Sequence, residues 1–380
     1  MTPSCRPRIG ILSAWASRLG GGVFEATVAH AELLGRAGFD PVMFALEDAH
    51  SAADAARYGE TPVVTVPVRG PGMIGYAPGL VPALRDARLD MLHLHGIWMY
   101  PSAAGAAWAK TSGRPYLVSP HGMLDPWIVE RGRAKKAVAR IGYERRSWRR
   151  ATLFHALTDA EADDIARATG RTATTVIPNP VARAAHGADP DDGPYALYLG
   201  RIHPKKNVAA LVDAWRASAD RLRPIGARLL IAGWGDPADV AALEAQIGDG
   251  DGGTIRFLGP VYDAPKARLL ADARFLVLPS HSEGLPVTVL EGWAAGTPSL
   301  MSAHCHLPEG FAAGAAIDTG TDIAGIAAAL QRGFALAPAA WRAMSAAASA
   351  LATGRFSPDA VAARWTDVCH ALLSGKAPAR

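Results

Sequence analysis

Residues 275–302 read "FLVLPSHSEGLPVTVLEGWAAGTPSLMS", and this stretch contains two apolar runs separated by a segment with helix signals. The first run, 275–280, is typical of a buried strand that ends at Pro and Ser. Pro286 suits the first position of a helix, while Gly296 and Pro298 mark the end of that helix. A strand followed by a helix and another strand predicts parallel strands with the helix packed on the sheet.

Two glutamates in this stretch raise a question about function. Glu283 is expected in the loop between strand and helix, and Glu291 about a turn and a half into the helix. A carboxylate among Val, Leu, Trp and Ala is costly to desolvate unless a hydrogen-bond donor compensates it. Either residue alone could lie on a solvated face, but their pairing within "EGLPVTVLE" (283–291) favours a bound ligand.

The same alternation of apolar strands and alanine-rich helical stretches runs through the whole chain. Expected strands in the first half are 8–15, 40–46, 89–98, 115–122, 151–157 and 174–180, and those in the second half are 195–201, 227–236, 254–261, 275–280 and 297–302. Such alternation is typical of parallel sheets covered by helices on both faces. The chain is therefore expected to be α/β, with two doubly wound domains facing each other across a cleft where ligands bind.

The domain boundaries follow from one stretch with little apolar content. The run "VARAAHGADPDDGP" (181–194) is rich in Gly, Pro and Asp, which is typical of a linker. We expect a first domain over 1–183, a linker over 184–194 and a second domain over 195–355. The final segment, 356–380, holds a Ser-capped amphipathic helix that is expected to cross back and pack on the first domain.

The composition excludes several classes of protein. The chain has 380 residues, 49% of them hydrophobic and 19% charged, with a formal net charge of +4. That charge is too small to argue for nucleic acid, and no run approaches about 20 apolar residues, the length of a membrane span. The N-terminus lacks the apolar core of a signal peptide. Three widely spaced cysteines, Cys5, Cys305 and Cys369, fit free thiols in a reducing cytoplasm better than disulfides or a zinc site.

Two loops are candidates for binding an anion. "RLGGGVFEA" (18–26) places Gly21 and Gly22 where a helix begins, and glycines there allow backbone amides to approach a phosphate. "YLGRIHPKKN" (198–207) places Arg201 and Lys206 after a strand, and such converging cations suit a pyrophosphate. A tight turn in the first case and a solvated basic turn in the second remain open for each loop alone.

Histidines occur near the ends of two expected strands. "SPHGMLD" (119–125) places His121 in a Pro/Gly loop, where a lone histidine is more often structural than catalytic. His93 and His95 alternate within an expected strand, and a metal pair would need a third ligand that the sequence does not identify. We therefore expect no metal site.

The segment 130–150, "ERGRAKKAVARIGYERRSWRR", carries nine Lys or Arg residues against two Glu, with Ile141, Tyr143 and Trp148 among them. Three interpretations compete: a solvated helix, a nucleic-acid-binding face and a helix on a membrane surface. Basic amphipathic helices with tryptophan attract anionic lipid headgroups, by about 1 kcal/mol per basic residue near the surface. We expect contact with an anionic membrane and no binding of nucleic acid.

The order of these elements resembles the retaining glycosyltransferases of family 4. The glycine turn, the His–Gly loop and the linker are followed by "GRIHPKK" (200–206), "FLGPV" (257–261) and "SEGLPVTVLEGWAAGTP" (282–298). The resemblance covers roughly 8–375, and its most specific part is the E-x7-E spacing of the two glutamates. It implies the GT-B fold, in which two Rossmann-like domains face each other across a cleft.

The resemblance implies roles for the residues that match the family's motifs. Glu291 would bind the ribose hydroxyls of a nucleotide sugar, Glu283 would bind the transferred sugar, and Arg201 with Lys206 would hold the diphosphate. The donor-binding set would be Gly21, Gly22, Arg201, Lys206, Val261, Glu283, Gly284, Leu285 and Glu291. The groups closest to the chemistry would be Glu283, His121, Arg201 and Lys206, and the acceptor-side residues would be His95 and His121.

The resemblance also implies retention of anomeric configuration through front-face attack, in which the leaving phosphate takes the acceptor's proton. No protein nucleophile, metal or other cofactor would then be required. The histidine loops followed by a basic helix are similar to enzymes of surface-polysaccharide assembly, which act on polyprenyl-diphosphate-linked acceptors at the inner face of the membrane. Such a protein would be cytoplasmic, or peripheral on that membrane. Asn207, where relatives often have Gly, leaves the identity of the donor open.

Two other functions have to be weighed against this one. A nucleotide-sugar epimerase on the same fold would need further acid–base carboxylates in the cleft, and the E-x7-E element with "GRIHPKK" argues against it. A catalytically silent subunit could bind a nucleotide sugar or serve as the scaffold of a polysaccharide assembly complex. Loss of Arg201, Lys206 or Glu291 would favour that function, and all three are present.

Overall fold

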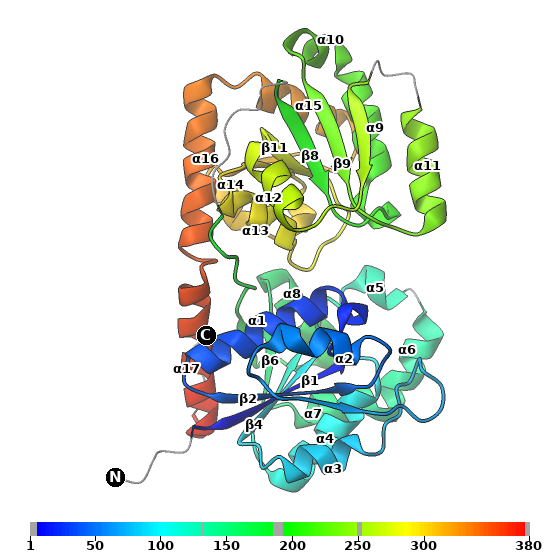
Figure 1. Ribbon diagram of the computed structural model, residues 1–380, viewed down its shortest axis with the longest axis vertical. Coiled ribbons are helices and arrows are strands. Elements are labelled where there is room, and N and C mark those ends of the chain that lie inside the picture. Colours follow the sequence, from blue (N-terminus) through cyan, green and yellow to red (C-terminus); the bar gives the residue numbers. More distant parts are fainter. Residues whose placement is uncertain (1–5, 131, 185–192, 249–252, 377–380) are drawn as a thin grey trace. The chain divides into compact units, whose positions relative to one another are not determined.

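The computed structural model of the protein describes residues 6–130, 132–184, 193–248 and 253–376. The chain divides into two compact units, Met1–Asn179 with Pro358–Arg380, and Pro180–Ser357. Each unit is a parallel sheet with helices on its faces (Figure 1). Most of the expected linker 184–194 lies outside the described residues.

The first unit contains a seven-stranded parallel sheet in the order β3-β2-β1-β4-β5-β6-β7. The strands are β1 (Arg8–Trp15), β2 (Asp40–Leu46), β3 (Val63–Val66), β4 (Met91–His95), β5 (Tyr116–Ser119), β6 (Leu153–Ala156) and β7 (Thr174–Val176). The chain order reverses between β1 and β4, and ligands of such open sheets bind where strands end beside this point.

Helices cover both faces of this sheet, as the alternation along β1 requires. Ile9 and Ile11 pack in one core cluster with α1 and α17, whereas Leu12 packs in the cluster that contains α3, α4 and α7. The helical elements are η1 (Arg18–Gly20), α1 (Gly22–Arg36), α2 (Ser51–Asp54), η2 (Ala55–Tyr58), α3 (Leu80–Asp86), α4 (Tyr100–Ser112), α5 (Pro126–Glu130), α6 (Arg133–Ala139), the π-helical turn η3 (Arg140–Glu144), α7 (Arg145–Arg150), α8 (Asp159–Thr169) and α17 (Pro358–Leu373).

The second unit contains a six-stranded parallel sheet in the order β10-β9-β8-β11-β12-β13 around one core cluster. Its strands are β8 (Tyr195–Leu199), β9 (Arg228–Ala232), β10 (Ile255–Gly259), β11 (Phe275–Leu278), β12 (Ser299–Met301) and β13 (Ala316–Asp318). Its helical elements are η4 (Pro204–Lys206), α9 (Val208–Ala217), α10 (Ala219–Leu222), η5 (Arg223–Ile225), α11 (Pro237–Ile247), α12 (Asp263–Asp272), α13 (Val287–Ala294), η6 (Ala303–Cys305), α14 (Pro308–Ala312), α15 (Ile323–Phe334) and α16 (Pro338–Thr353).

The expected α/β class with two Rossmann-like sheets is confirmed. Strands β3 and β13 were missed because both are short edge strands with incomplete burial, so that neither forms a long apolar run. The expected strand 89–98 was too long, since β4 ends at His95 and Gly96 turns the chain with φ +80°. That the two sheets face each other across a cleft stays a prediction.

Within the described residues, no single helix combines the length and hydropathy of a membrane span, although the bent pair Ile323–Phe334 and Pro338–Leu373, broken by 109°, reaches both values together. Cys305 and Cys369 are buried free thiols, and Cys5 lies outside the described residues.

Candidate active site

The loop between β11 and α13 presents a buried carboxylate that is bound by a lysine. Glu283 is 7% exposed, and Lys206 Nζ lies 2.6 and 2.5 Å from its two carboxylate oxygens. The Ser280 hydroxyl donates to Glu283 Oε1 at 2.6 Å. Glu283 and Lys206, separated by 77 positions in the sequence, are thus brought together at the carboxyl ends of β8 and β11, which are neighbours in the sheet.

Local backbone geometry places Lys206 at this position. It ends η4, in which the His203 side chain accepts a hydrogen bond from the Lys205 amide. Asn207 follows with φ +60°, a left-handed conformation that Gly and Asn adopt most readily. Its Nδ2 donates to the carbonyl oxygens of Pro279 and Thr321, at 3.1 and 2.7 Å. Asn207, which stands where relatives often have Gly, therefore adopts this conformation readily and ties the lysine loop to the end of β11.

The second glutamate forms a second ion pair one helix away. Glu291 on α13 accepts from Lys266 Nζ of α12 at 2.7 Å through Oε1. Its Oε2 is buried and has no hydrogen-bond partner among the described residues. Both residues line a cavity of about 420 Å³, together with Arg183 and Asp263. Lys266 was missed from the sequence, because no spacing pattern links a lysine in one helix to a glutamate in the next.

Arg201 follows β8 and is exposed at the same edge of the sheet. Its guanidinium carbon lies 5.5 Å from the centre of the Trp234 ring, a cation–π contact. The β9 loop reaches this position because Gly233 packs against Gly200: a Cβ on Gly233 would lie 1.8 Å from the Gly200 carbonyl oxygen. Only glycine allows this approach, which sets Trp234 beside Arg201.

The remaining donor-binding candidates lie in loops at strand ends. Val261 is half-buried between β10 and α12, and Gly284 and Leu285 are half-buried between Glu283 and α13. Pro286 is the N-cap of α13 and not its first residue. In the first unit, Gly21 is the N-cap of α1 with φ +52°, and a Cβ on either Gly21 or Gly22 would meet no atom within 4 Å. The α1 N-terminus is therefore open to close approach by a ligand.

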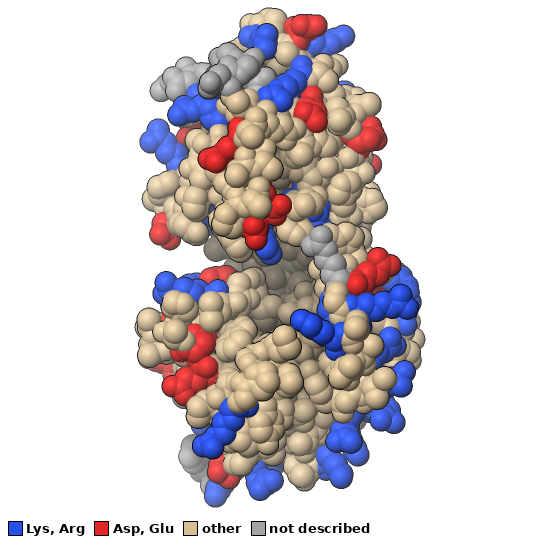
Figure 2. Space-filling view, turned by 90° about the vertical axis from the view of Figure 1, so that its right-hand side faces the viewer, with Lys and Arg blue, Asp and Glu red and all other residues tan. Residues whose placement is uncertain are grey.

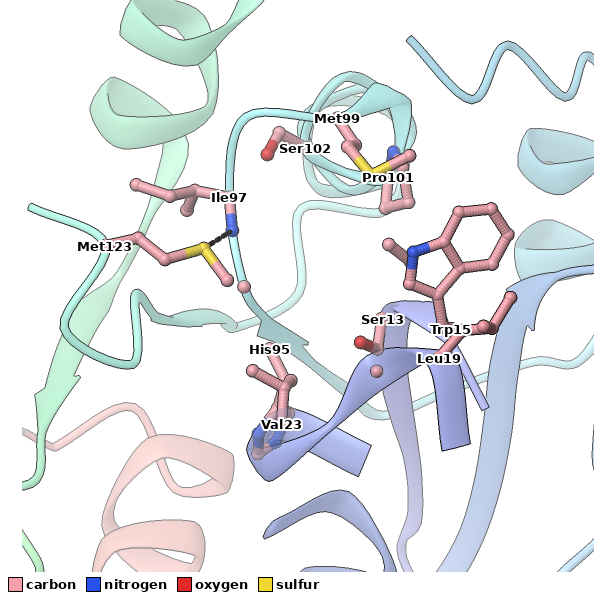
Figure 3. Close-up of a pocket in the computed structure, with 13 residues that line it drawn as sticks. Ser13, Trp15, Leu19, Val23, His95, Ile97, Met99, Pro101, Ser102 and Met123 are labelled. Carbon is pink, nitrogen blue, oxygen red and sulfur yellow. Dashed lines mark hydrogen bonds between the residues drawn. The ribbon is translucent and has the colours of Figure 1, made fainter. Parts of the chain in front are cut away.

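His95 and His121 end up side by side in the first unit. His95 Nδ1 lies 2.9 Å from His121 Nε2, with the rings stacked at 24°. His95 also lines a cavity of about 200 Å³ at the carboxyl ends of β1 and β4. Figure 3 shows its wall, in which no side chain is charged: Ser13, Trp15, Leu19, Val23, Ile97, Met99, Pro101, Ser102 and Met123. The cavity suits an uncharged group with apolar surface.

A chain of hydrogen bonds fixes the tautomers of three further buried histidines, His155, His93 and His30. His155 Nε2 lies 2.7 Å from the Ile177 carbonyl oxygen, which can only accept, so Nε2 carries the proton. His155 Nδ1 then accepts from the Ser119 hydroxyl at 2.7 Å, and Ser119 accepts from His93 Nε2 at 2.6 Å. His93 Nδ1 is left to accept from His30 Nε2 at 3.0 Å. Burial lowers the pKa of His30 to about 3 and that of His155 to about 4, so both are neutral.

His30 is a candidate for the third nitrogen ligand that the sequence did not identify. Ring nitrogens of His30, His93 and His95 lie within 4.8 Å of one another, so these three residues could hold a metal ion. All three rings already have a hydrogen-bond partner: His30 and His93 in the chain of bonds above, and His95 through His121. Trp365 of α17 packs against His30 and His93, with ring centres 4.5 and 5.1 Å apart, which links α17 to this cluster.

The basic segment 130–150 forms α6, η3 and α7 on the surface of the first unit; Arg131 lies outside the described residues. Val138 and Ile141 are 73% and 72% exposed among its cations. Figure 2, which views the side where α6 lies in Figure 1, shows many Lys and Arg side chains on this unit. Glu144, by contrast, is fully buried.

Two family models match the chain. The model "Glycosyl transferase 4-like domain" matches residues 21–180, and "Glycosyl transferases group 1" matches residues 193–335. The chain is 36% identical over 120 residues to the O-antigen chain mannosyltransferase B of Escherichia coli, covering 30% of each protein. It is 33% identical over 203 residues to a D-inositol 3-phosphate glycosyltransferase of Streptomyces griseus, covering 51% of this chain and 42% of that protein. The chain thus matches less than half the length of these curated relatives.

Many solved structures share this fold and cover nearly the whole chain, and two of them serve as examples. HepE of Anabaena, in complex with UDP and glucose, has a TM-score of 0.76 and 17% identity, covering 96% of this chain and 100% of that one. Sucrose-phosphate synthase of Thermosynechococcus elongatus has a TM-score of 0.75 and 20% identity, covering 98% and 100%. At such identities the likeness shows the fold alone, and that fold is GT-B.

Proposed function

We propose, from the premise that this chain belongs to the family 4 glycosyltransferases, that it transfers a sugar from a nucleotide-diphosphate donor to a saccharide acceptor in polysaccharide or glycoconjugate synthesis. One observation carries the proposal. The E-x7-E element places two carboxylates on a single strand–helix unit, and each is bound by a lysine: Glu283 by Lys206 and Glu291 by Lys266.

The donor's ribose is proposed to bind at Glu291. A buried carboxylate oxygen without a partner is costly, and ribose hydroxyls would supply the missing donors to Oε2. The adjoining cavity of about 420 Å³ gives the nucleoside room, and Val261 would face the base through its backbone. Gly21 and Gly22 would let the α1 amides approach the phosphates.

The diphosphate is proposed to bind at Arg201 and Lys206. Cations that neutralise a departing phosphate lower the barrier most when they are already in place, and Asn207 holds the lysine loop rigidly. Lys206 is also the residue that compensates Glu283, so the same lysine would link the phosphate to the carboxylate at the transferred sugar, beside the amides of Gly284 and Leu285.

The reaction is proposed to retain configuration without a protein nucleophile. Both oxygens of Glu283 accept from Lys206, and Oε1 also accepts from the Ser280 hydroxyl, so the carboxylate is a weaker nucleophile while Oε2 can still accept a hydrogen bond from a sugar hydroxyl. Front-face attack, in which the leaving phosphate takes the acceptor's proton, fits these contacts. It requires no metal, because Arg201 and Lys206 would carry the phosphate charge.

The acceptor is proposed to be a saccharide, polyprenyl-diphosphate-linked, that binds near His95 and His121. The uncharged wall of the 200 Å³ cavity suits a sugar face, and Trp15 offers an aromatic surface for it (Figure 3). The basic segment with Val138 and Ile141 would hold the protein on an anionic membrane, at its cytoplasmic face. The O-antigen relative supports a role in surface polysaccharide.

The first test is a panel of UDP-, GDP- and ADP-hexoses in EDTA, read by thermal stabilisation and slow donor hydrolysis. Binding raises the melting temperature with the logarithm of ligand excess, so one donor should stand out. Glu291→Ala should weaken that nucleotide's binding about tenfold. Glu309→Ala is the matched control, because Glu309 is also ion-paired, to Arg355, and also has an unpartnered buried Oε2.

Equal nucleotide affinity in the wild type and Glu291→Ala would contradict the ribose assignment. Failure of every donor to bind at millimolar concentration would overturn the transferase proposal and favour a silent scaffold subunit.

A further inference from the structure

Two buried glutamates in the first unit each accept a hydrogen bond from the backbone of a loop that follows a strand. Glu144 Oε1 accepts from the Trp98 amide at 2.6 Å, across 46 positions of sequence. Glu161 Oε1 accepts from the Gly122 amide at 2.6 Å, across 39 positions. Glu144 and Glu161 are 0% and 4% exposed, and neither takes part in an ion pair among the described residues. Burying a carboxylate without a cation costs free energy, so the presence of these two glutamates in the interior needs an explanation.

The loops that they hold have strained backbones. Trp98 follows β4 with φ +77°, and His121 follows β5 with φ +55°, both in the left-handed region that a residue with a side chain rarely adopts. Such a conformation costs on the order of 1–3 kcal/mol and persists only where surrounding contacts enforce it. Glu144 binds the amide of Trp98 itself, and Glu161 binds the amide of Gly122, the residue after His121, so both carboxylates contribute to holding these conformations.

The two loops also contact each other, so that restraining one loop restrains the other. His95 Nδ1 lies 2.9 Å from His121 Nε2. The Ile97 amide lies 3.3 Å from Met123 Sδ, which Figure 3 marks, and Trp98 Nε1 donates to the Met123 carbonyl at 3.2 Å. Ile97 and Met123 line the 200 Å³ cavity with His95. The geometry of this wall therefore depends on both loops.

The two glutamates differ in how many bonds each makes. Glu161 uses both oxygens, because Oε2 accepts from the Leu157 amide at 2.8 Å while Thr158 caps the same helix. Glu144 makes one close hydrogen bond, through Oε1, and its Oε2 is buried without a partner at hydrogen-bonding distance among the described residues. The Ser102 hydroxyl and the Trp148 ring N–H, which are also buried, lie near enough to this carboxyl to act against the rise of its pKa. Ser102 lines the cavity, so Glu144 lies directly behind the wall. Burial raises the pKa of Glu144 to about 7.

We propose that Glu144 and Glu161 are positioning residues for the acceptor: they act through the Trp98 and Gly122 amides to set His95, His121 and the cavity wall, and they touch no substrate. The inference rests on the proposed transferase function and deepens it. It also gives the π-helical turn η3 a role, because Glu144 ends that turn and the neighbouring Tyr143 hydroxyl donates to the Trp98 carbonyl at 2.8 Å.

Because Glu144 accepts from one backbone amide and Glu161 from two, the same substitution should have different effects at the two positions. Glu144→Gln keeps a carbonyl oxygen for Trp98, so acceptor KM should stay within about threefold of the wild type. Glu144→Asp keeps the carboxyl group but shortens its reach, so its KM should rise about tenfold, as for Glu144→Ala. Glu161→Gln loses one of two bonds and should resemble Glu144→Ala. A catalytic or ionic role would reverse the order of Gln and Asp at position 144.

The measurement is transfer to a polyprenyl-diphosphate-linked saccharide acceptor, alongside donor-induced thermal stabilisation, which all these variants should keep because the donor-binding residues lie in other loops. Donor hydrolysis without acceptor is measured on the wild type. Wild-type protein that hydrolyses donor but transfers to no acceptor overturns the proposed function. Wild-type transfer with unchanged acceptor KM in folded Glu144→Asp and Glu161→Gln overturns this inference. If Glu144→Ala does not fold, the Gln and Asp variants still decide.

Discussion

Lys206 Nζ lies 2.6 and 2.5 Å from the two carboxylate oxygens of Glu283, and the lysine and glutamate side chains are only 24% and 7% exposed. A pair so far removed from water is held by mutual compensation, since either charge alone would be buried without a partner. Because each charge depends on the other, variants that remove one charge or both can separate the pair's contribution to stability from its contribution to ligand binding.

Removing only the lysine should therefore be worse than removing both charges. Lys206→Met leaves Glu283 as an unpaired buried charge and should lower the free energy of unfolding by roughly 3 kcal/mol. The double variant Lys206→Met with Glu283→Gln should recover most of that loss, and neither should transfer sugar. Urea denaturation checks the first statement and transfer assays the second. Additive losses in the double variant would show that the two side chains are energetically independent.

The E-x7-E stretch could be interpreted from sequence because its meaning is local. A strand, a loop with Glu283 and a helix with Glu291 follow one another directly, and the observed β11 and α13 match them closely. The partner lysine of Glu291 could not be predicted, because Lys266 reaches it only through the packing of α12 on α13. Glu161 left a signal in "TDAE" (158–161), a capping-box spacing, but its bond to Gly122 depends on the tertiary fold.

His30 illustrates the same limit in the histidine cluster. His93 and His95 alternate on one strand, so their proximity follows from sequence, whereas His30 lies on α1, 63 positions before His93. Only the packing of α1 on the sheet brings the third imidazole into place. The edge strands β3 and β13 were missed for a related reason, since their pairing partners and not their own residues define them.

Asn207 should stabilise the protein in two ways, through its left-handed backbone conformation and through the hydrogen bonds of its side-chain amide. Asn207→Gly keeps access to φ +60° but loses the bonds to Pro279 and Thr321, whereas Asn207→Ala loses the bonds and adds left-handed strain. We expect destabilisation by roughly 1–2 kcal/mol for Gly, and about 1 kcal/mol more for Ala. Chemical denaturation of both variants measures the difference. Equal stability of the two would mean that the strain is relieved elsewhere.

The buried histidines should make stability fall as pH falls. The folded pKa values of His30 and His155 are lowered to about 3 and 4, while the unfolded values are near 6.5. Between about pH 6.5 and 4 the unfolded state binds more protons, so stability is fully present above 6.5 and is lost towards 4, by up to about 1.4 kcal/mol per pH unit per histidine. Glu144, whose folded pKa is raised to about 7, acts in the opposite direction.

Comparing the pH dependence of stability between a histidine variant and the wild type cancels the contribution of Glu144, because both proteins carry that residue. His155→Gln should have a shallower dependence of unfolding free energy on pH than the wild type. Denaturant titrations between pH 7 and 5 measure these slopes. Identical slopes in the two proteins would mean that His155 binds a proton as readily in the folded state as in the unfolded state.

The surface of α6 and η3 should bind anionic vesicles through charge and apolar contact together. Val138 and Ile141 are exposed among cations, so they would be the side chains that enter the headgroup layer. The pair Val138→Ser with Ile141→Ser should weaken sedimentation with phosphatidylglycerol vesicles roughly tenfold. Binding by the wild type should also fall steeply with salt, because lysine and arginine bring the helix to the surface. Ile225→Ser, an exposed isoleucine in the second unit, is the control and should bind like the wild type. Wild-type protein that ignores vesicles at low salt would leave this segment a solvated helix, and the acceptor would then have to reach the protein without help from the membrane.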